Sequence, residues 1–147
     1  MKSEDILFSL TVSIVLIVII KFFFLSPIIV KGESMSSTFN DGDISFSLPS
    51  NTYRIFKIFL KDKNYSFLKD KNVIVEHGNK KLIKRCVGIP NDTIILKEIS
   101  GNEKKIIVPQ DSFFLIGDNF RDSYDSRYFG FVGFKEIKGI IVFEKKL

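Results

Sequence analysis

The sequence predicts a mainly β fold that follows a single N-terminal transmembrane helix. The largely apolar stretch Ile6–Leu25 has one charge, Lys21, and at about 1.5 Å per residue it is long enough to cross the hydrocarbon core of a bilayer. After it come short runs rich in Ile, Val and Phe, with turn residues between them, which is typical of strands in an antiparallel sheet. For a chain of 147 residues we expect an anchor, residues 1–25, and one compact β domain, residues 26–147.

The apolar stretch is predicted to stay in place as an anchor rather than to be removed as a signal peptide. Lys2 is followed closely by two acidic residues, so the positive region of a signal peptide is weak. The stretch is also long, and large residues occupy Phe23–Leu25, where a cleavage site would need small ones. The flanking charges are too few to decide which end of the helix faces the cytoplasm.

The remaining segments are assigned from alternation and turn chemistry. Pro27 ends the helix, and hairpin turns are expected at Asn79-Lys80 and Gly101-Asn102. The basic, Phe-rich segment Tyr53–Lys71 fits either a short amphipathic helix or strands on the membrane surface. Loops are expected at Gly32–Gly42 and Gly117–Tyr128. Strands are predicted at Ile28–Val30, Ile44–Leu48, Val73–Glu76, Lys81–Gly88, Thr93–Lys97, Lys104–Val108, Ser112–Ile116 and Gly139–Glu144.

Composition narrows the classes of function. Without Met1–Leu25 the chain has 20 basic and 15 acidic residues, the same net charge of +5 as the whole, which suits a surface near anionic lipid headgroups. No helix-turn-helix, zinc or aromatic-platform motif accompanies the charge, so nucleic acid is not an expected partner. One His and one Cys cannot build a transition-metal site, and no glycine-rich phosphate loop is present. We therefore expect no metal and no cofactor.

The first segment that can carry chemistry is Gly32–Phe39, where Ser34 lies on a predicted turn beside a glycine. A serine on such a turn can present its hydroxyl and backbone N–H groups to a carbonyl. Taken alone this signal is weak, because serine is common in loops.

The second segment is Leu82–Asp92. On a strand, Lys84 shares a face with Leu82 and Cys86. Burial between apolar neighbours lowers the pKa of a lysine, and a neutral lysine can take a proton from a serine hydroxyl. Arginine cannot do so because it stays protonated. The alternative is a solvated Lys84 on an exposed face, which is the usual place of a lysine.

The third segment is Gly117–Gly130. Asp125 and Arg127 are two residues apart and can pair locally, and Ser123 can hydrogen-bond a neighbouring amine. The single histidine, His77, lies in a segment that looks like an exposed turn, so a Ser-His-Asp triad has only that one possible base.

These three segments, in this order behind an N-terminal anchor, resemble the type I signal peptidases. That family has S-M-x-P-T at its nucleophile, K-R-x-x-G-x-P-G-D at its lysine base and G-D-N…S-x-D-S-R-x-x-G near its end. The corresponding residues here are Ser34-Met35-Ser36-Ser37-Thr38, Lys84-Arg85-Cys86-Val87-Gly88-Ile89-Pro90-Asn91-Asp92 and Gly117-Asp118-Asn119…Ser123-Tyr124-Asp125-Ser126-Arg127-Tyr128-Phe129-Gly130. Each motif is moderately specific, and their joint order is highly specific.

The resemblance implies a role for each of these residues. Ser34 would be the nucleophile and Lys84 the general base, with Ser123 orienting the lysine amine. Asp125 and Arg127 would hold their loop, while Gly32 and Ser34 would donate backbone N–H groups to the oxyanion. The small substrate pockets would be lined by Val30, Met35, Phe39 and Ile83.

The resemblance also implies a substrate and a location. The family binds preproteins as an extended strand and cuts signal peptides after small residues, as in Ala-x-Ala. Its catalytic domain lies on the extracytoplasmic side of the cytoplasmic membrane, so preproteins and phospholipid are the expected partners.

Several positions depart from the family pattern. Ser37 replaces a proline, Asn91 replaces a glycine, and Phe120 stands where arginine is usual. Lys71-Asn72 replaces a Gly-Asp pair before a Val-rich strand. These departures motivate an alternative, a catalytically weak membrane-tethered paralogue that binds or recruits preproteins. Ser34 and Lys84 are both present, which favours the enzyme.

Overall fold

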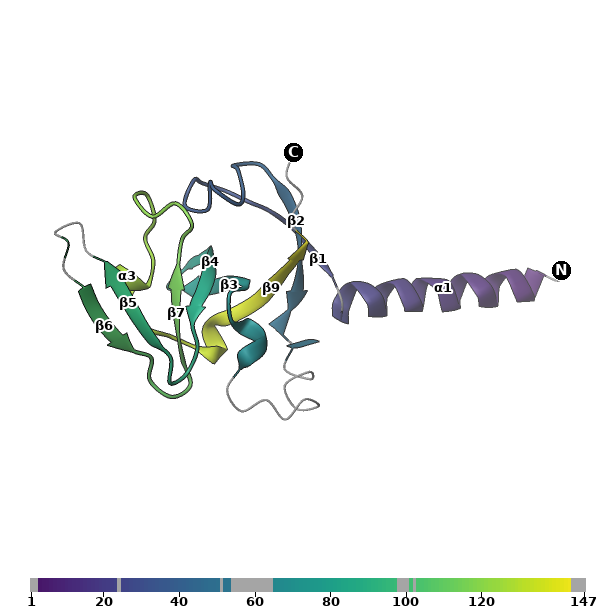
Figure 1. Cartoon of the computed structure of the whole chain (residues 1–147). Helices are drawn as coiled ribbons and strands as arrows, with labels where there is room; N and C mark the ends of the chain where they lie inside the picture. Colours follow the sequence, from purple (N-terminus) through teal and green to yellow (C-terminus); the bar gives the residue numbers. More distant parts are fainter. Residues whose placement is uncertain are drawn as a thin grey trace.

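The computed structural model describes residues 3–23, 25–50, 52–53, 65–97, 101 and 103–143. It consists of one long helix, α1 (Ser3–Phe23), followed by a β domain. Figure 1 shows α1 extending away from this domain, with the N-terminus at its far end. The predicted fold class, mainly antiparallel β with one N-terminal apolar helix, is confirmed.

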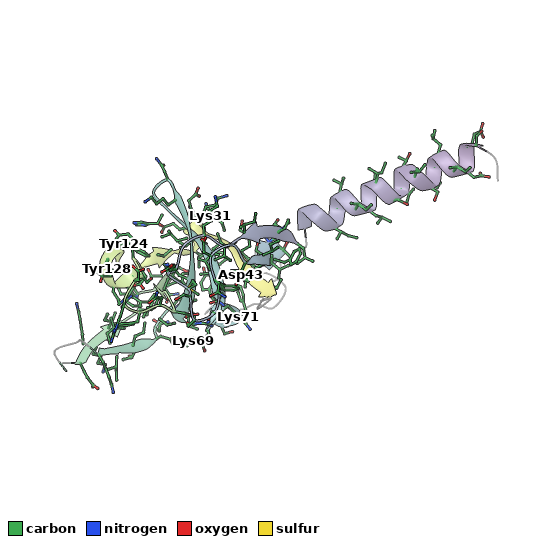
Figure 2. All side chains as sticks on the ribbon, turned by 90° about the horizontal axis from the view of Figure 1, so that it is seen from above. Lys31, Asp43, Lys69, Lys71, Tyr124 and Tyr128 are labelled. Carbon is green, nitrogen blue, oxygen red and sulfur yellow. The ribbon has the colours of Figure 1, made fainter. Side chains whose placement is uncertain are left out.

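Helix α1 has the properties that a membrane-spanning segment needs. The section Ser3–Ile20 is long and apolar enough to cross a bilayer, and none of it is buried against the β domain. Its hydroxyl groups are satisfied within the helix, because Thr11 and Ser13 donate to the carbonyls of Leu7 and Ser9 at 2.9 and 2.8 Å. The side chains of α1 project outward into open surroundings (Figure 2), so all sides of the helix are free to contact lipid.

The β domain is built on one antiparallel sheet of seven strands in the order β1-β2-β9-β3-β4-β7-β8. A separate hairpin, β5 (Thr93–Lys97) with β6 (Glu103–Ile107), lies at the end of the domain remote from α1 (Figure 1). The strands of the main sheet are β1 (Ser26–Ile29), β2 (Ile44–Pro49), β3 (Asn72–His77), β4 (Lys80–Gly88), β7 (Ser112–Ile116), β8 (Val132–Gly133) and β9 (Ile137–Phe143).

Each of the eight predicted strands overlaps an observed one, and three short described elements outside the segment Tyr53–Lys71 were missed. Strand β8 has two residues, helix α3 (Ser126–Phe129) has four and the 3-10 turn Phe134–Glu136 has three, so none is long enough to show a periodic pattern. The β3–β4 turn is Gly78-Asn79, one residue earlier than expected, because Gly78 takes the left-handed conformation at φ +58°. His77 accordingly belongs to β3 rather than to an exposed turn.

Two other expectations fall partly outside the described residues. Most of the ambiguous segment Tyr53–Lys71 does so, and its described end contains a single 3-10 turn, Ser66–Leu68. Of the expected turn Gly101-Asn102, Gly101 is described, with φ +84°, between β5 and β6.

Two buried clusters hold the sheet. The larger packs aromatic and aliphatic side chains from β3, β4, β7 and β9, and within it Tyr53 donates its hydroxyl to the carbonyl of Ile137. The smaller cluster is Val30, Met35, Phe39 and Ile141. It lies directly beneath the loop that carries Ser34, so it fixes the height of that loop above the sheet.

Strand pairing leaves two strand edges open near this loop. Among the described strands, β1 is at the end of the sheet and pairs only with β2. In β4, residues 80–84 pair with β3 alone, because the pairing with β7 begins at Arg85. Open edges of this kind can accept an added strand.

Candidate active site

The structure brings Ser34 and Lys84 into contact. Lys84 Nζ lies 2.6 Å from Ser34 Oγ, within hydrogen-bonding distance. Lys84 comes from the middle of β4 and is only 1% exposed, whereas Ser34 lies on the turn after Val30. The two residues are 50 positions apart in sequence, so the fold of the sheet creates this pair.

The turn that carries Ser34 is held by its own backbone and by the loop after β7. Ser36 N–H donates to the carbonyl of Glu33 at 3.0 Å, and Phe39 N–H to that of Met35 at 2.7 Å. From the other side, Asn119 donates its backbone N–H to the Ser34 carbonyl at 3.0 Å and its side-chain amide to the Glu33 carbonyl at 3.1 Å. Ser34 is therefore fixed from both flanks.

The environment of Lys84 favours its neutral form. Burial lowers the pKa of Lys84, and the nearby carboxylates of Asp125 and Asp118 offset only part of this effect. Cys86, on the same buried face of β4, has its pKa raised by burial to about 12. Its thiol thus stays protonated and is a poor nucleophile.

Asp125 and Arg127 form a two-pronged ion pair beside the lysine. Arg127 Nε and Nη2 donate to the two carboxylate oxygens at 2.8 and 2.7 Å, and Gly117 N–H donates to the same carboxylate at 2.9 Å. Burial raises the pKa of Asp125, but these hydrogen bonds outweigh it, so the pKa is lowered and the carboxylate stays charged. The ring of Phe120 lies 3.9 Å from the Arg127 guanidinium, so this departure from the family pattern contributes a cation–π contact.

A second ion pair, which the sequence did not reveal, ties the three motif segments together. Arg85 Nε and Nη2 donate to Asp118 at 2.8 and 2.6 Å. Thr38, on the turn that carries Ser34, donates its hydroxyl to the same carboxylate at 2.5 Å. The pattern places Arg85 on the side of β4 opposite Lys84, and no sequence signal linked it to Asp118.

Ser123 lies beside the Asp125–Arg127 ion pair, and its hydroxyl does not make the expected hydrogen bond to the Lys84 amine. Its side chain is buried, and Ser123 Oγ makes no hydrogen bond of good geometry with another described residue. It is still close enough to the Asp125 carboxylate to help lower the pKa of that group. The orientation of the Lys84 amine by Ser123 stays a prediction.

Gly117 provides the space in which Ser123 approaches Ser34. A Cβ atom on Gly117 would lie 2.0 Å from Ser123 Oγ and 2.6 Å from the Ser34 carbonyl oxygen. Both contacts are far closer than atoms tolerate, so only glycine fits here. A residue with a side chain would push apart the loop that carries Ser34 and the loop that carries Ser123.

The structure differs from the sequence-based expectation at Gly32. Its N–H donates to Asp41 Oδ1 at 2.7 Å, so this donor is already occupied. The backbone at Gly32 has φ +84°, a conformation that suits glycine. Within the described residues, Ser34 N–H forms no hydrogen bond, which leaves it as the donor available for an oxyanion.

A cavity of about 540 Å³ opens next to Ser34 between the open edges of β1 and β4. Val30, Met35 and Ile83 contribute to its wall. Phe39 does not line it, because this side chain is buried behind Met35 in the smaller cluster. The cavity is lined by Ser26–Gly32, Ser34, Met35, Ser47, Pro49, Ile74, Lys81–Ile83 and Lys138.

The other departures from the family pattern fit the backbone without disturbing the site. Asn91 has φ +70°, a conformation that glycine adopts freely and asparagine tolerates. Lys71 accepts the Cys86 N–H at its carbonyl at 2.9 Å, a contact that any residue can make. Ser37 lies exposed on the nucleophile turn.

Comparison with known proteins agrees with this geometry. The sequence model of the family described as "Signal peptidase, peptidase S26" matches residues 3–106 and 95–144, nearly the whole chain. The chain belongs to this family. It is 30% identical to Signal peptidase I of Bacillus amyloliquefaciens over 81% of the chain and 74% of that relative. It is 27% identical to Signal peptidase IB of Staphylococcus aureus over 97% of the chain and 90% of that relative.

Membership makes the chain a serine peptidase of the signal peptidase type. Its described residues bring together a serine, a buried lysine and an adjoining cavity.

Replacing Gly117 with alanine is expected to lower activity about 100-fold, because a displacement of about 1 Å at reacting groups has an effect of this size. The enforced contacts should also reduce the free energy of unfolding by about 1–3 kcal/mol. Peptide cleavage rates and denaturant unfolding of the purified chain measure the two effects.

Gly133→Ala is the matched control. Its backbone has φ −80°, and a Cβ atom there meets nothing closer than Glu136 Oε2 at 3.5 Å. Wild-type activity in Gly117→Ala would show that the two loops do not need this close approach.

Proposed function

We propose that the chain is a membrane-anchored signal peptidase in which residues 1–25 form the anchor and residues 26–147 the catalytic domain. Ser34 is the nucleophile and Lys84 the general base. The observation that carries this proposal is the 2.6 Å contact between Lys84 Nζ and Ser34 Oγ, made by a lysine that is 1% exposed. Burial lowers the pKa of a lysine in such a place, so more of it is neutral and able to take the Ser34 proton.

The substrate is a preprotein bound as an extended strand between β1 and β4. Support comes from the two open strand edges and from the cavity between them, at whose end Ser34 lies. Backbone hydrogen bonds to these edges accept many sequences. The apolar wall formed by Val30, Met35 and Ile83 supports selection of small side chains at −1 and −3, as in Ala-x-Ala.

The reaction proceeds by acyl transfer. Neutral Lys84 takes the proton of Ser34 Oγ as this oxygen bonds to the scissile carbonyl carbon, and the Ser34 N–H stabilises the oxyanion that forms. The C–N bond then breaks, and the Lys84 ammonium gives its proton to the leaving amine. In deacylation Lys84 takes a proton from water, whose oxygen attacks the ester, and returns it to Ser34.

The anchor places the cleavage site near the bilayer surface. Strand β1 begins at Ser26, three residues after α1 ends at Phe23, so the cavity is close to the point where the chain leaves the membrane. We place the catalytic domain on the extracytoplasmic side of the cytoplasmic membrane, where the family resemblance puts it and where signal peptides emerge.

The dyad is tested with the detergent-solubilised full chain and a preprotein that carries an Ala-x-Ala site. Ser34→Ala is expected to abolish cleavage, and Lys84→Ala to lower it at least about 10³-fold. Lys84→Arg should be equally inactive, because arginine keeps the charge but does not release its proton. Product mass identifies the bond that is cut.

Ser36→Ala and Lys80→Arg are the controls, since both residues are exposed and each lies on the same element as its catalytic neighbour. Both should cleave like the wild type. A wild-type chain that binds several preproteins and cuts none of them would contradict the proposal.

The pH dependence of cleavage reports the protonation of Lys84. Because burial lowers its pKa below the usual 10.5, kcat/KM should rise with pH and level off below that value. The Asp125 carboxylate raises the pKa of Lys84, so Asp125→Asn should move the rising limb to lower pH. A limb that stays in place while only the maximal rate falls would assign Asp125 a structural role alone.

A further inference from the structure

The substrate cavity has a charged region that the proposed mechanism does not use. Among the described residues that line the cavity, the ionisable ones are all lysines, namely Lys31, Lys81 and Lys138. Figure 2 labels Lys31 on the ribbon that follows β1. Ile74, Leu82 and Ile83 lie in the same wall, so the cavity combines apolar surface with a basic rim.

Strand register places two of these lysines together on the cavity side of the sheet. Lys81 is opposite Glu76 and Ile83 is opposite Ile74, so Lys81 and Ile83 share the face that lines the cavity. Lys138 Nζ lies 2.9 Å from Glu76 Oε2. In the described part of the chain Lys81 forms no such ion pair, and Glu76 alone does not neutralise the three lysines.

The position of the lysines relative to the dyad fixes which part of a substrate they meet. Lys81 precedes Lys84 by three residues on β4, a separation of about 10 Å along a strand. The anchor joins the domain at Ser26, the first residue of β1, which is opposite Ser47 of β2. Two residues further along β2, Pro49 is opposite Gly139 of β9, the neighbour of Lys138 in sequence. Lys138 therefore lies toward the end of the cavity where the anchor joins the domain.

A signal peptide reaches Ser34 from the membrane, because its apolar segment lies in the bilayer. The residues that precede the cleavage site therefore run from the anchor end of the cavity toward the dyad. In an extended chain, about 10 Å from the scissile bond corresponds to about three residues. Counted from position −1, three residues upstream is position −4, and the long Lys81 side chain extends its reach to positions −5 and −6.

We propose, on the basis of the function proposed above, that this cavity selects signal peptides carrying an acidic residue four to six positions before the cleavage site. Lys81 is the main determinant, and Lys31 and Lys138 add to its field. The lysines belong to the cavity that contains Ser34, and this favours a substrate carboxylate over a lipid headgroup as the group they contact.

The size of the preference follows from the exposure of the lysines. Lys138 has a side chain that is 40% exposed, and Lys31 and Lys81 are exposed as well, so solvent screens each contact. Ion pairs of this kind change binding by modest factors. We expect a preference of about three- to tenfold between acidic and basic substrates, which shrinks in high salt.

The test uses the full chain in non-ionic detergent and three preproteins that share an Ala-x-Ala site and differ only at position −5, which is Glu, Gln or Lys. The wild type should give kcat/KM in the order Glu, Gln, Lys. Lys81→Gln should bring the three values close together, and Lys81→Glu should reverse their order. A reversal cannot arise from partial unfolding. Lys80→Gln, an exposed change on the same strand outside the cavity, should leave the order unchanged.

Equal values for all three preproteins in the wild type would overturn this inference while leaving the proposed function intact. So would an order that Lys81→Glu does not alter. If the Lys81 variants lose rate equally on all substrates, and only in vesicles of anionic phospholipid, the lysines contact headgroups and the inference is wrong. If the wild type cuts none of the three, the proposed function fails as well.

Discussion

The structure depends on one unfavourable placement, the burial of the Lys84 amine against Ser34 Oγ. Burial lowers the pKa of a lysine placed in this way. The unfolded chain binds the same proton more tightly, so at neutral pH this group subtracts from stability. The penalty shrinks as pH rises from the lowered pKa toward the usual 10.5. The domain therefore has to hold Lys84 in place with contacts made elsewhere.

Those contacts come from two charged pairs that flank the dyad on different sides. Arg85 and Asp118 bind β4 to the nucleophile turn through Thr38, and Asp125 and Arg127 hold the loop after β7. Both carboxylates remain ionised and raise the pKa of Lys84 somewhat, while Arg127 opposes them. The balance leaves a lysine that is less basic than usual in surroundings that are firmly hydrogen-bonded.

The sequence was sufficient for the fold class and for the approach of Ser34 to Lys84 wherever the signal was periodic or carried by a motif. Alternation on β4 correctly grouped Lys84 with Cys86 on the buried face. The sequence was insufficient where a single contact decides the role of a residue in the site. Nothing in the order of residues indicates that Asp41 takes the Gly32 N–H, or that Phe39 packs behind the cavity rather than in its wall. The Arg85–Asp118 pair joins segments 33 residues apart, and such contacts are known only once the sheet is folded.

The most direct test of this account is the ionisation of Lys84 itself, followed by 15N NMR of the full chain in detergent micelles with labelled lysine. The Lys84→Arg variant identifies the resonance by its loss. The burial of Lys84 predicts that its Nζ signal titrates below the usual 10.5 of a lysine side chain. If Lys84 titrates at its usual pKa, it is charged at working pH, and the proposed base is wrong.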